Sequence, residues 1–220
     1  MKSFLLAAVL AAPILAQAQS FEAAIGVNAY TAQANGTWYQ EGMPHSLKLR
    51  SPAFAVGLTG PLYQRSRWGV DWHVNYVYLG QVTSDCFCTA YDANYDFVRH
   101  QKIDAAVPDQ HFHGTGHAQG IALTVEPYVM YRGWRIAIEA GLFPYRPTFD
   151  ETVTNADGSQ VLAQYPTPHA IQLGKTFGVS VGRGNFRVAL KRYILPTRYD
   201  DQHSPAVWRD ATMVEIRYVF

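Results

Sequence analysis

Two short motifs in the middle of the chain carry side chains that can bind a metal ion. Cys86 and Cys88 are separated by one residue, as are His111 and His113. In an extended segment, alternate side chains point to the same face, so the two imidazoles would lie side by side. Zinc and copper accept such sulfur and nitrogen ligands. The spacing lacks the Cys-x2-Cys and His-x3-His patterns, so a disulfide or free thiols with solvated histidines is the alternative.

The composition limits the classes of protein that the chain can belong to. Its 220 residues are 48% hydrophobic and 16% charged, against about 25% charged in an average protein. Intrinsic disorder is therefore excluded for most of the chain. The formal net charge is +1, from 18 Lys and Arg against 17 Asp and Glu. A general polyanion binder is far more basic, so no nucleic-acid partner is expected.

The first 18 residues are typical of an export signal. Lys2 precedes an apolar run over residues 4–14, and Ala16 and Ala18 form a small-residue cleavage site. We expect cleavage after Ala18, which leaves residues 19–220 as one domain. Export delivers the two cysteines to an oxidising compartment. No later apolar run approaches the ~20 residues that a membrane helix needs.

The remaining sequence alternates between apolar and polar residues with a period of two. Ile121, Leu123 and Val125, for example, oppose Thr124 and Glu126. Such alternation is typical of β-strands with one apolar face. The apparent strands are longer than the ~5–6 residues of average strands. Eight are expected, over residues 21–31, 47–59, 68–78, 121–129, 134–142, 171–181, 186–194 and 214–220.

The connections between these strands alternate in length. Residues 60–67, 132–133 and 182–185 form short connections, and the other connections are long, over residues 33–46, 80–119, 144–169 and 196–207. Because lipid cannot hydrogen-bond a strand edge, a sheet crosses a membrane only as a closed barrel. The pattern predicts an all-β fold: an eight-stranded antiparallel up-and-down transmembrane β-barrel with short periplasmic turns and long external loops. Aromatic residues mark the periplasmic strand ends, as expected at a lipid–water interface: Phe21, Trp68, Tyr131, Trp134, Phe186, Tyr218 and Phe220.

The polar face of these strands must then line the barrel interior. Eight strands leave an interior that side chains fill. The inward set holds His73 with five acids and four bases: Glu22, Asp71, Glu126, Glu139, Glu215, Arg135, Arg187, Lys191 and Arg217. Because buried charges must be paired, we expect an internal salt-bridge network.

One residue conflicts with the apolar outer face. Lys175 falls on that face in the expected strand 171–181. A charge at the membrane midplane costs roughly 2–4 kcal/mol. We expect a bulge near Gly174 to turn Lys175 inward.

The third long loop contains a hairpin signal. Asp157 and Gly158 separate two runs of β-prone residues, which predicts that the flanking strands continue past the membrane surface. The hairpin edge, with Tyr145, Phe149 and Tyr165 nearby, is the expected contact surface for another protein. A merely solvated hairpin is the alternative.

The C-terminal residues 217–220, Arg-Tyr-Val-Phe, resemble the assembly signal of outer-membrane barrels. Together with the leader and the eight strands, residues 19–220 resemble the small barrels of the OmpA/OmpX type. This resemblance implies a fold and a location but no activity. Residues 38–42 and 139–147 also resemble uncharacterised small barrels encoded by bacteriophages and prophages.

A second resemblance suggests chemistry. Residues 180–194 are similar to the end of the lipid A palmitoyltransferase barrel, a family that uses a loop histidine with an Asp-Ser pair. The corresponding residues are His45 with Ser84 and Asp85, here in reversed order, and no amphipathic helix precedes the first strand. The resemblance implies acyl transfer, for which the histidine must reach the hydroxyl.

These features lead to one functional hypothesis and one main alternative. We expect a monomeric, non-enzymatic barrel in the outer membrane of a Gram-negative-type envelope. Its external loops would bind a surface partner, its wall would contact lipopolysaccharide, and no cofactor is implied. The alternative is a lipid A-modifying acyltransferase or hydrolase. A pore for small solutes is disfavoured because the inward side chains are bulky and paired.

Overall fold

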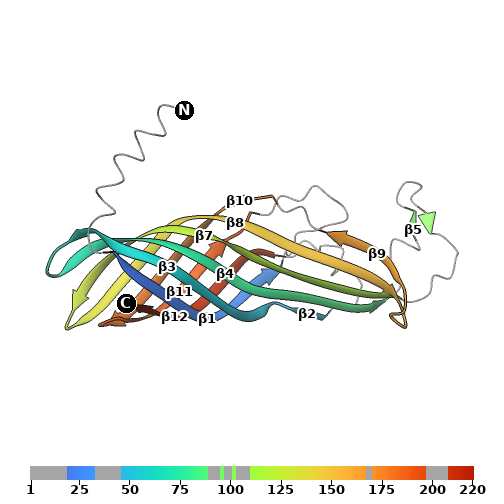
Figure 1. Ribbon diagram of the computed structural model, residues 1–220, viewed down its shortest axis with the longest axis horizontal. Helices are drawn as coiled ribbons and strands as arrows, with labels where there is room; N and C mark the ends of the chain where they lie inside the picture. Colours follow the sequence, from blue (N-terminus) through green and yellow to red (C-terminus); the bar gives the residue numbers. More distant parts are fainter. Residues whose placement is uncertain are drawn as a thin grey trace, which may run out of the picture.

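The computed structural model describes residues 19–32, 46–88, 95–96, 101–102, 110–166, 170–196 and 208–220. Antiparallel strands dominate this part of the chain (Figure 1). No helix within it is long and apolar enough to cross a lipid bilayer. The strands are β1 (Ser20–Ala32), β2 (Ser46–Lys48), β3 (Arg50–Gln64), β4 (Trp68–Cys88), β5 (Tyr95–Asp96), β6 (Gln101–Lys102), β7 (Gln110–Tyr131), β8 (Trp134–Asn155), β9 (Val161–Pro166), β10 (Gln172–Arg183), β11 (Phe186–Ile194) and β12 (Trp208–Val219).

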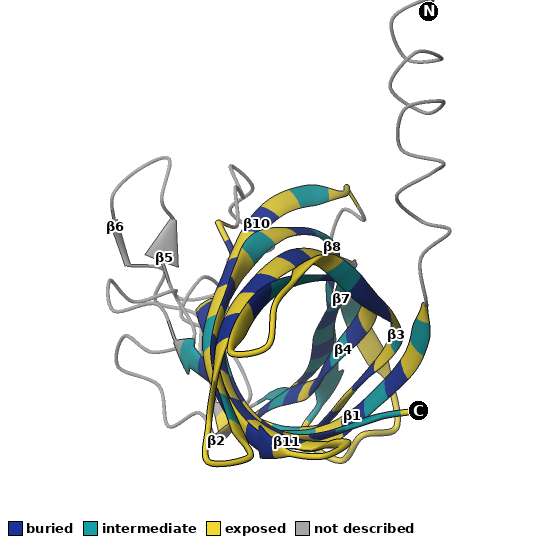
Figure 2. Cartoon of the chain, turned by 90° about the vertical axis from the view of Figure 1, so that its left-hand side faces the viewer, coloured by how far each residue is buried: buried dark blue, intermediate teal, exposed yellow. Residues whose placement is uncertain are grey.

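Eight of these strands form a closed ring. Hydrogen-bonded neighbours follow the order β10, β11, β12, β1, β3, β4, β7 and β8, and β8 pairs back to β10. Each of these pairings is antiparallel. Figure 2 looks into the ring. Outside it, β2 pairs with β4 and β9 pairs with β8. The predicted eight-stranded, up-and-down antiparallel barrel is confirmed.

The side chains that face away from the ring are apolar. In β11, Val188 and Leu190 are about half exposed, whereas Arg187 and Lys191 are buried inside. A soluble barrel has the reverse arrangement, because its apolar side chains form the core. Lipid matches an apolar exterior, and the closed ring satisfies the backbone hydrogen bonds. The prediction that the apolar face points away from the barrel axis is confirmed.

One end of the barrel, here called the turn end, carries the short connections. β7 and β8 join through Arg132 and Gly133, whose φ angles of 51° and 82° suit a type I′ hairpin. Aromatic rings gather at the same end. Phe21 lies 5.3 Å from Phe220 between ring centroids, and Phe220 lies 4.8 Å from Tyr218. Such rings favour the lipid–water interface, so the turn end lies at one membrane surface.

At the other end, β4, β7 and β8 run further than the sequence predicted. They contain 21, 22 and 22 residues. The predicted loops over residues 80–119 and 144–169 are therefore wrong at their boundaries, because strands occupy much of both segments. The prediction relied on outward apolar residues, and this signal stops where the strands leave the lipid. β4 crosses that boundary through a bulge between Tyr78 and Gln81, where Gly80 has a φ of 81°.

The predicted hairpin at residues 157–158 is confirmed as the connection between β8 and β9. The Asn155 amide donates to the Gln160 carbonyl at 3.0 Å, which closes the turn. The amide and hydroxyl of Ser159 hydrogen-bond to the Asp157 carboxylate and hold its pKa below the usual value. β8 and β9 therefore extend together beyond the ring, as Figure 1 shows.

The predicted bulge at Gly174 is wrong. β10 pairs without a register shift to β8 and β11 around this position. Gly174 is buried, Lys175 is exposed and Thr176 is buried, so Lys175 stays on the outer face. Lys175 precedes the last residue of β10, Arg183, by eight positions, which at ~3.3 Å per residue and a tilt of ~40° is about 20 Å above the turn end. That height approaches the far boundary of a ~25 Å apolar band, where a charge meets lipid headgroups.

Candidate functional site

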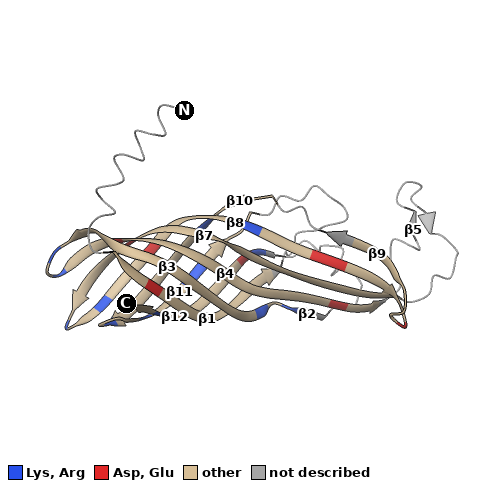
Figure 3. Cartoon of the chain, in the orientation of Figure 1, with Lys and Arg blue, Asp and Glu red and all other residues tan. Residues whose placement is uncertain are grey.

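Ten inward-facing ionisable side chains of the described residues form one connected network near the turn end. They are the same ten residues that the sequence placed on the inward face of the strands. Figure 3 marks the charged positions along the strands. The members are Glu22, Asp71, His73, Glu126, Arg135, Glu139, Arg187, Lys191, Glu215 and Arg217.

Arg217 lies at the centre of this network and is 1% exposed. Its Nη2 atom donates to Glu139 at 2.9 Å and to Glu215 at 2.8 Å. Its Nη1 atom lies 3.7 Å from Glu22 and 3.6 Å from Glu126. One guanidinium thus contacts carboxylates from β12, β8, β1 and β7, which links strands across the barrel.

Arg135 closes the network toward the turn end. Its Nη2 atom donates to Asp71 at 2.7 Å and to Glu126 at 2.6 Å. Its guanidinium carbon lies 3.4 Å from the centroid of the Tyr128 ring, a cation–π contact. Charge pairing and stacking together fix the Arg135 side chain across the barrel interior at the turn end.

A separate apolar layer fills the half of the barrel beyond the network. Phe143, Tyr145 and Tyr193 are at most 1% exposed. The Phe143 and Tyr145 rings stack at 5.5 Å between centroids, and the Tyr193 ring meets Phe143 edge-on at 5.0 Å. The described interior is therefore packed with side chains from the turn end outward, as eight-stranded barrels require.

The apolar exterior, the closed ring and the paired charges inside decide the architecture. The chain is a small transmembrane β-barrel. The apolar layer of this barrel was missed at the sequence level, although alternation on β8 continues from Glu139 through Gly141 to Phe143 and Tyr145. The prediction that Tyr145 and Phe149 lie on a protein-contact surface is wrong, because both point inward and are buried. The side chain of Tyr165, the third residue of that predicted surface, lies outside the described residues.

Beyond the bulge, three barrel strands and two strands from outside the ring form what we call the projecting sheet. It comprises β2, residues 81–88 of β4, residues 110–119 of β7, residues 146–155 of β8, and β9. Its inner face continues the buried interior. Apart from Phe87 on β4 and the exposed apolar residues at the start of β9, its outer face is polar. The polar residues of that face are Thr83, Asp85, His111, His113, Thr115, Arg146, Thr148, Asp150, Thr152 and Thr154. This change from apolar to polar marks where the wall leaves the lipid.

The candidate acyltransferase residues do not assemble within the described structure. Ser84 is 2% exposed and faces the interior, whereas the neighbouring Asp85 is exposed on the outer face. Adjacent strand residues point to opposite faces, so these two side chains cannot share one site. His45 lies outside the described residues.

The cysteine and histidine motifs are separated in the same way. Cys86 is disulfide-bonded and packs with Phe112 and Val153 on the inner face of the projecting sheet. His111 and His113 lie on the outer face, as their spacing predicted. The side chain of Cys88 lies outside the described residues. The structure therefore brings the two histidines together but not with Cys86.

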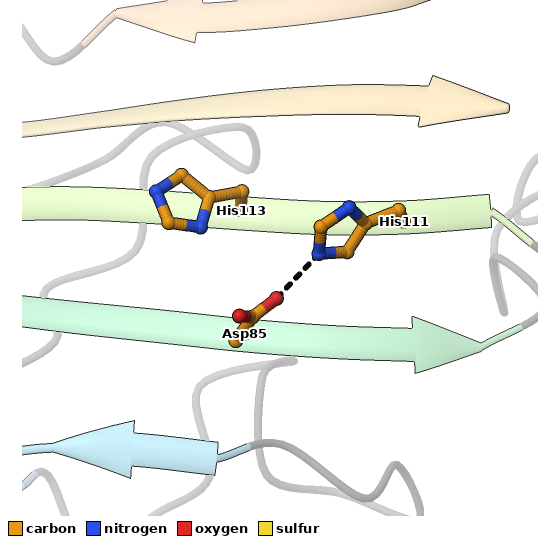
Figure 4. Close-up of side chains that lie close together, drawn as sticks. All are labelled: Asp85, His111 and His113. Atoms are coloured by element: carbon orange, nitrogen blue, oxygen red, sulfur yellow. Dashed lines mark hydrogen bonds and ion pairs between the residues drawn. The ribbon is translucent and has the colours of Figure 1, made fainter. Parts of the chain in front are cut away.

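Asp85 instead lies beside the two histidines, as Figure 4 shows. The Asp85 Oδ1 atom lies 2.5 Å from His111 Nε2. One ligand atom from each of the three side chains lies within 4.8 Å of the others. Sequence reasoning did not join Asp85 to the histidines, because the pairing of β4 with β7 has no local signal.

Three comparisons relate the chain to known proteins. No family model and no curated protein matches its sequence. Solved structures of Ail, the attachment invasion locus protein of Yersinia pestis, are similar to it. One is a complex with the heparin analogue sucrose octasulfate. Its alignment with this chain covers 92% of this chain and 99% of the Ail chain, at 13% sequence identity and a TM-score of 0.46. A second crystal structure of Ail is 12% identical and covers 93% and 99%, with a TM-score of 0.41. A backbone structure in a phospholipid nanodisc is 13% identical and covers 92% and 100%, with a TM-score of 0.29.

Proposed function

We propose that the chain is a monomeric outer-membrane protein that displays the projecting sheet outside the cell, where the sheet binds another protein without catalysing a reaction. The observation that carries this proposal is the length of β4, β7 and β8, which continue as paired strands with a polar outer face beyond the apolar wall. A rigid sheet loses little conformational entropy on binding. The packed interior supports a binding role rather than a pore.

The edge strand β9 is the proposed contact. Among the described strands, β9 pairs only with β8, so its other side presents backbone donors and acceptors. Val161 and Leu162 are 55% and 45% exposed at its start. An extended segment of a partner can add to such an edge, with backbone hydrogen bonds for affinity and apolar contacts for specificity.

We expect the replacement of both Val161 and Leu162 by Lys to weaken partner binding strongly, because edge lysines repel an added strand. Bacteria that display the wild-type chain or this variant would be applied to surfaces coated with a panel of serum and extracellular-matrix proteins. Wild-type cells should bind at least one coating above vector-only cells, and the variant should lose about tenfold or more of that binding, as for a contact of ~1.4 kcal/mol.

The matched control adds two lysines next to β9, as Ser159→Lys with Gln160→Lys in the exposed turn, and should bind like wild type. Surface display is verified first in cells, with Asp157→Cys labelled by a membrane-impermeant maleimide and Asn185→Cys at the turn end protected. The proposal is wrong if displayed wild-type cells bind no coating better than vector-only cells, or if Asn185→Cys alone is labelled.

We further propose that the wall contacts lipopolysaccharide phosphates near the far boundary of the apolar band. Arg192 and Arg209 line a surface groove with Phe177 and Ile194. Both guanidiniums are about half exposed and share the Asp210 carboxylate, at 3.1 and 3.4 Å. Arginine pairs well with phosphate oxygens, and the apolar side chains suit an acyl chain.

The double change Arg192→Gln with Arg209→Gln should lower the affinity for lipopolysaccharide roughly tenfold or more, since each base near an anionic surface contributes about 1 kcal/mol. Binding of purified lipopolysaccharide to the barrel in detergent micelles measures this. The matched pair Arg132→Gln with Arg183→Gln removes two exposed bases at the turn end and should have no effect. Equal losses in both pairs would contradict the proposed groove.

A further inference from the structure

We propose that Asp85, His111 and His113 form a binding site for a divalent transition-metal ion, best matched by zinc, on the outer face of the projecting sheet. The two imidazoles and one carboxylate are a ligand set that zinc accepts in three-ligand sites with an open fourth position. This site is distinct from the proposed protein contact at β9, and it does not depend on it.

The pairing of β4 with β7 places the three side chains together. Asp85 lies directly opposite His113, and the next outward position of β4, Phe87, lies opposite His111. His111 and His113 are two residues apart on β7, so their side chains leave the same face. The site is therefore set by two regular, paired strands, which hold ligands more firmly than a loop does.

The distances suit a site that closes around an ion by small side-chain rotations. His111 Nε2 lies 2.5 Å from Asp85 Oδ1, and the most distant pair of ligand atoms lies within 4.8 Å. Zinc bonds of 2.0–2.2 Å place neighbouring ligand atoms about 3.3 Å apart in a tetrahedron. Asp85 and His113 are exposed, so their side chains have room to rotate.

The surroundings orient one imidazole and leave space for a further ligand. The Phe87 ring stacks on His111 at 4.1 Å between centroids, with an interplanar angle of 2°. On β8, the residues opposite His113 and His111 are Thr152 and Thr154, which are small and uncharged. On β8, therefore, no positively charged side chain among the described residues lies directly opposite these histidines. A water molecule can supply the fourth ligand.

A bound ion would tie β4 to β7 near the ends of both strands. On the inner face of the same strand pair, the disulfide-bonded Cys86 packs against Phe112. Metal on one face and apolar packing on the other would clamp the two strands that flank residues 89–109. Zinc binding would therefore make the projecting sheet more rigid.

Calorimetric titration of zinc into the full chain, refolded in detergent without a histidine tag, tests this site. We expect one zinc ion per chain in wild type. His111→Gln, His113→Gln and Asp85→Asn should each lower the zinc affinity at least tenfold, because removing a ligand should cost no less than the loss of a residue that only orients a ligand. The matched control is His117→Gln, on the same face of β7 but outside the cluster, which should bind within about twofold of wild type.

Each variant is first checked for the compact gel migration of a folded barrel, and these outer-face changes leave the buried layers intact. X-ray absorption of the zinc-loaded wild type gives an independent readout and should show two imidazole ligands. The site is refuted if wild type binds no zinc, if binding persists in the His111→Gln/His113→Gln double variant, or if His117→Gln loses as much affinity as the cluster variants.

Discussion

Replacing Arg217 with Met should lower the free energy of unfolding by about 3–5 kcal/mol, the range for breaking a buried ion pair by removing one partner. Arg217 touches the carboxylates of Glu22, Glu126, Glu139 and Glu215 within 3.7 Å. Methionine keeps the apolar stem but removes the charge, so these acids would repel one another in the barrel interior. Urea unfolding of the refolded barrel in lipid vesicles, followed by tryptophan fluorescence, measures the change.

The control for this variant is Arg183→Met, the same chemical change at an exposed position of the turn end, which should shift stability by less than about 0.5 kcal/mol. Adding Glu139→Gln to Arg217→Met should restore part of the loss, because it removes one of the five acids that then outnumber the three remaining bases of the network. If Arg217→Met and Arg183→Met unfold at the same urea concentration as wild type, the network does not stabilise the barrel.

Replacing Leu190 with Lys should destabilise the barrel by about 2–4 kcal/mol, the cost of a lysine on the lipid face at the membrane midplane. Leu190 is about half exposed on the outside of β11, and its partners on the neighbouring strands are Val179 and Val214. No acid lies opposite it on either strand. The same unfolding measurement in lipid vesicles reports the effect.

The matched control makes the opposite change, from lysine to leucine, at another position of the same outer face. Lys175→Leu removes a charge that lies on the outer face near the far boundary of the wall, so its effect should stay within about 1 kcal/mol, as for lipid-face charges near the interface. A barrel in which Leu190→Lys is as stable as wild type would contradict the assignment of the outer wall to lipid.

Alternation in the sequence was sufficient to predict the ring because lipid imposes one rule on every strand that crosses it. Residues such as Val188 and Leu190 must face outward, so Arg187 and Lys191 between them must face inward. The same rule assigned Arg217 to the interior. It did not show which acids Arg217 contacts, because Glu139 comes from a distant strand and meets it only when the ring closes.

The outer region was harder to predict because the bulge in β4 changes which residues of that strand face outward. Before it, the outward residues of β4 are even-numbered, such as Val74 and Tyr76. Continued alternation would turn Ser84 outward and Asp85 inward. The extra residue between Tyr78 and Gln81 reverses this, which brings Asp85 to the face of His111 and His113. A bulge of this kind depends on how the strand pairs with its neighbours, so the local sequence did not predict it.

The length of β4, β7 and β8 also has a consequence for biogenesis. In the orientation proposed above, the hydrophilic tips of these strands must traverse the hydrocarbon before the barrel is complete, and they carry Asp85, Arg146 and Asp150 with them. Desolvating such groups in lipid is costly. Spontaneous insertion would meet a high kinetic barrier, which an insertase that shields the tips during passage would lower. In that orientation, the length of the projecting strands would set the height of the barrier to membrane insertion.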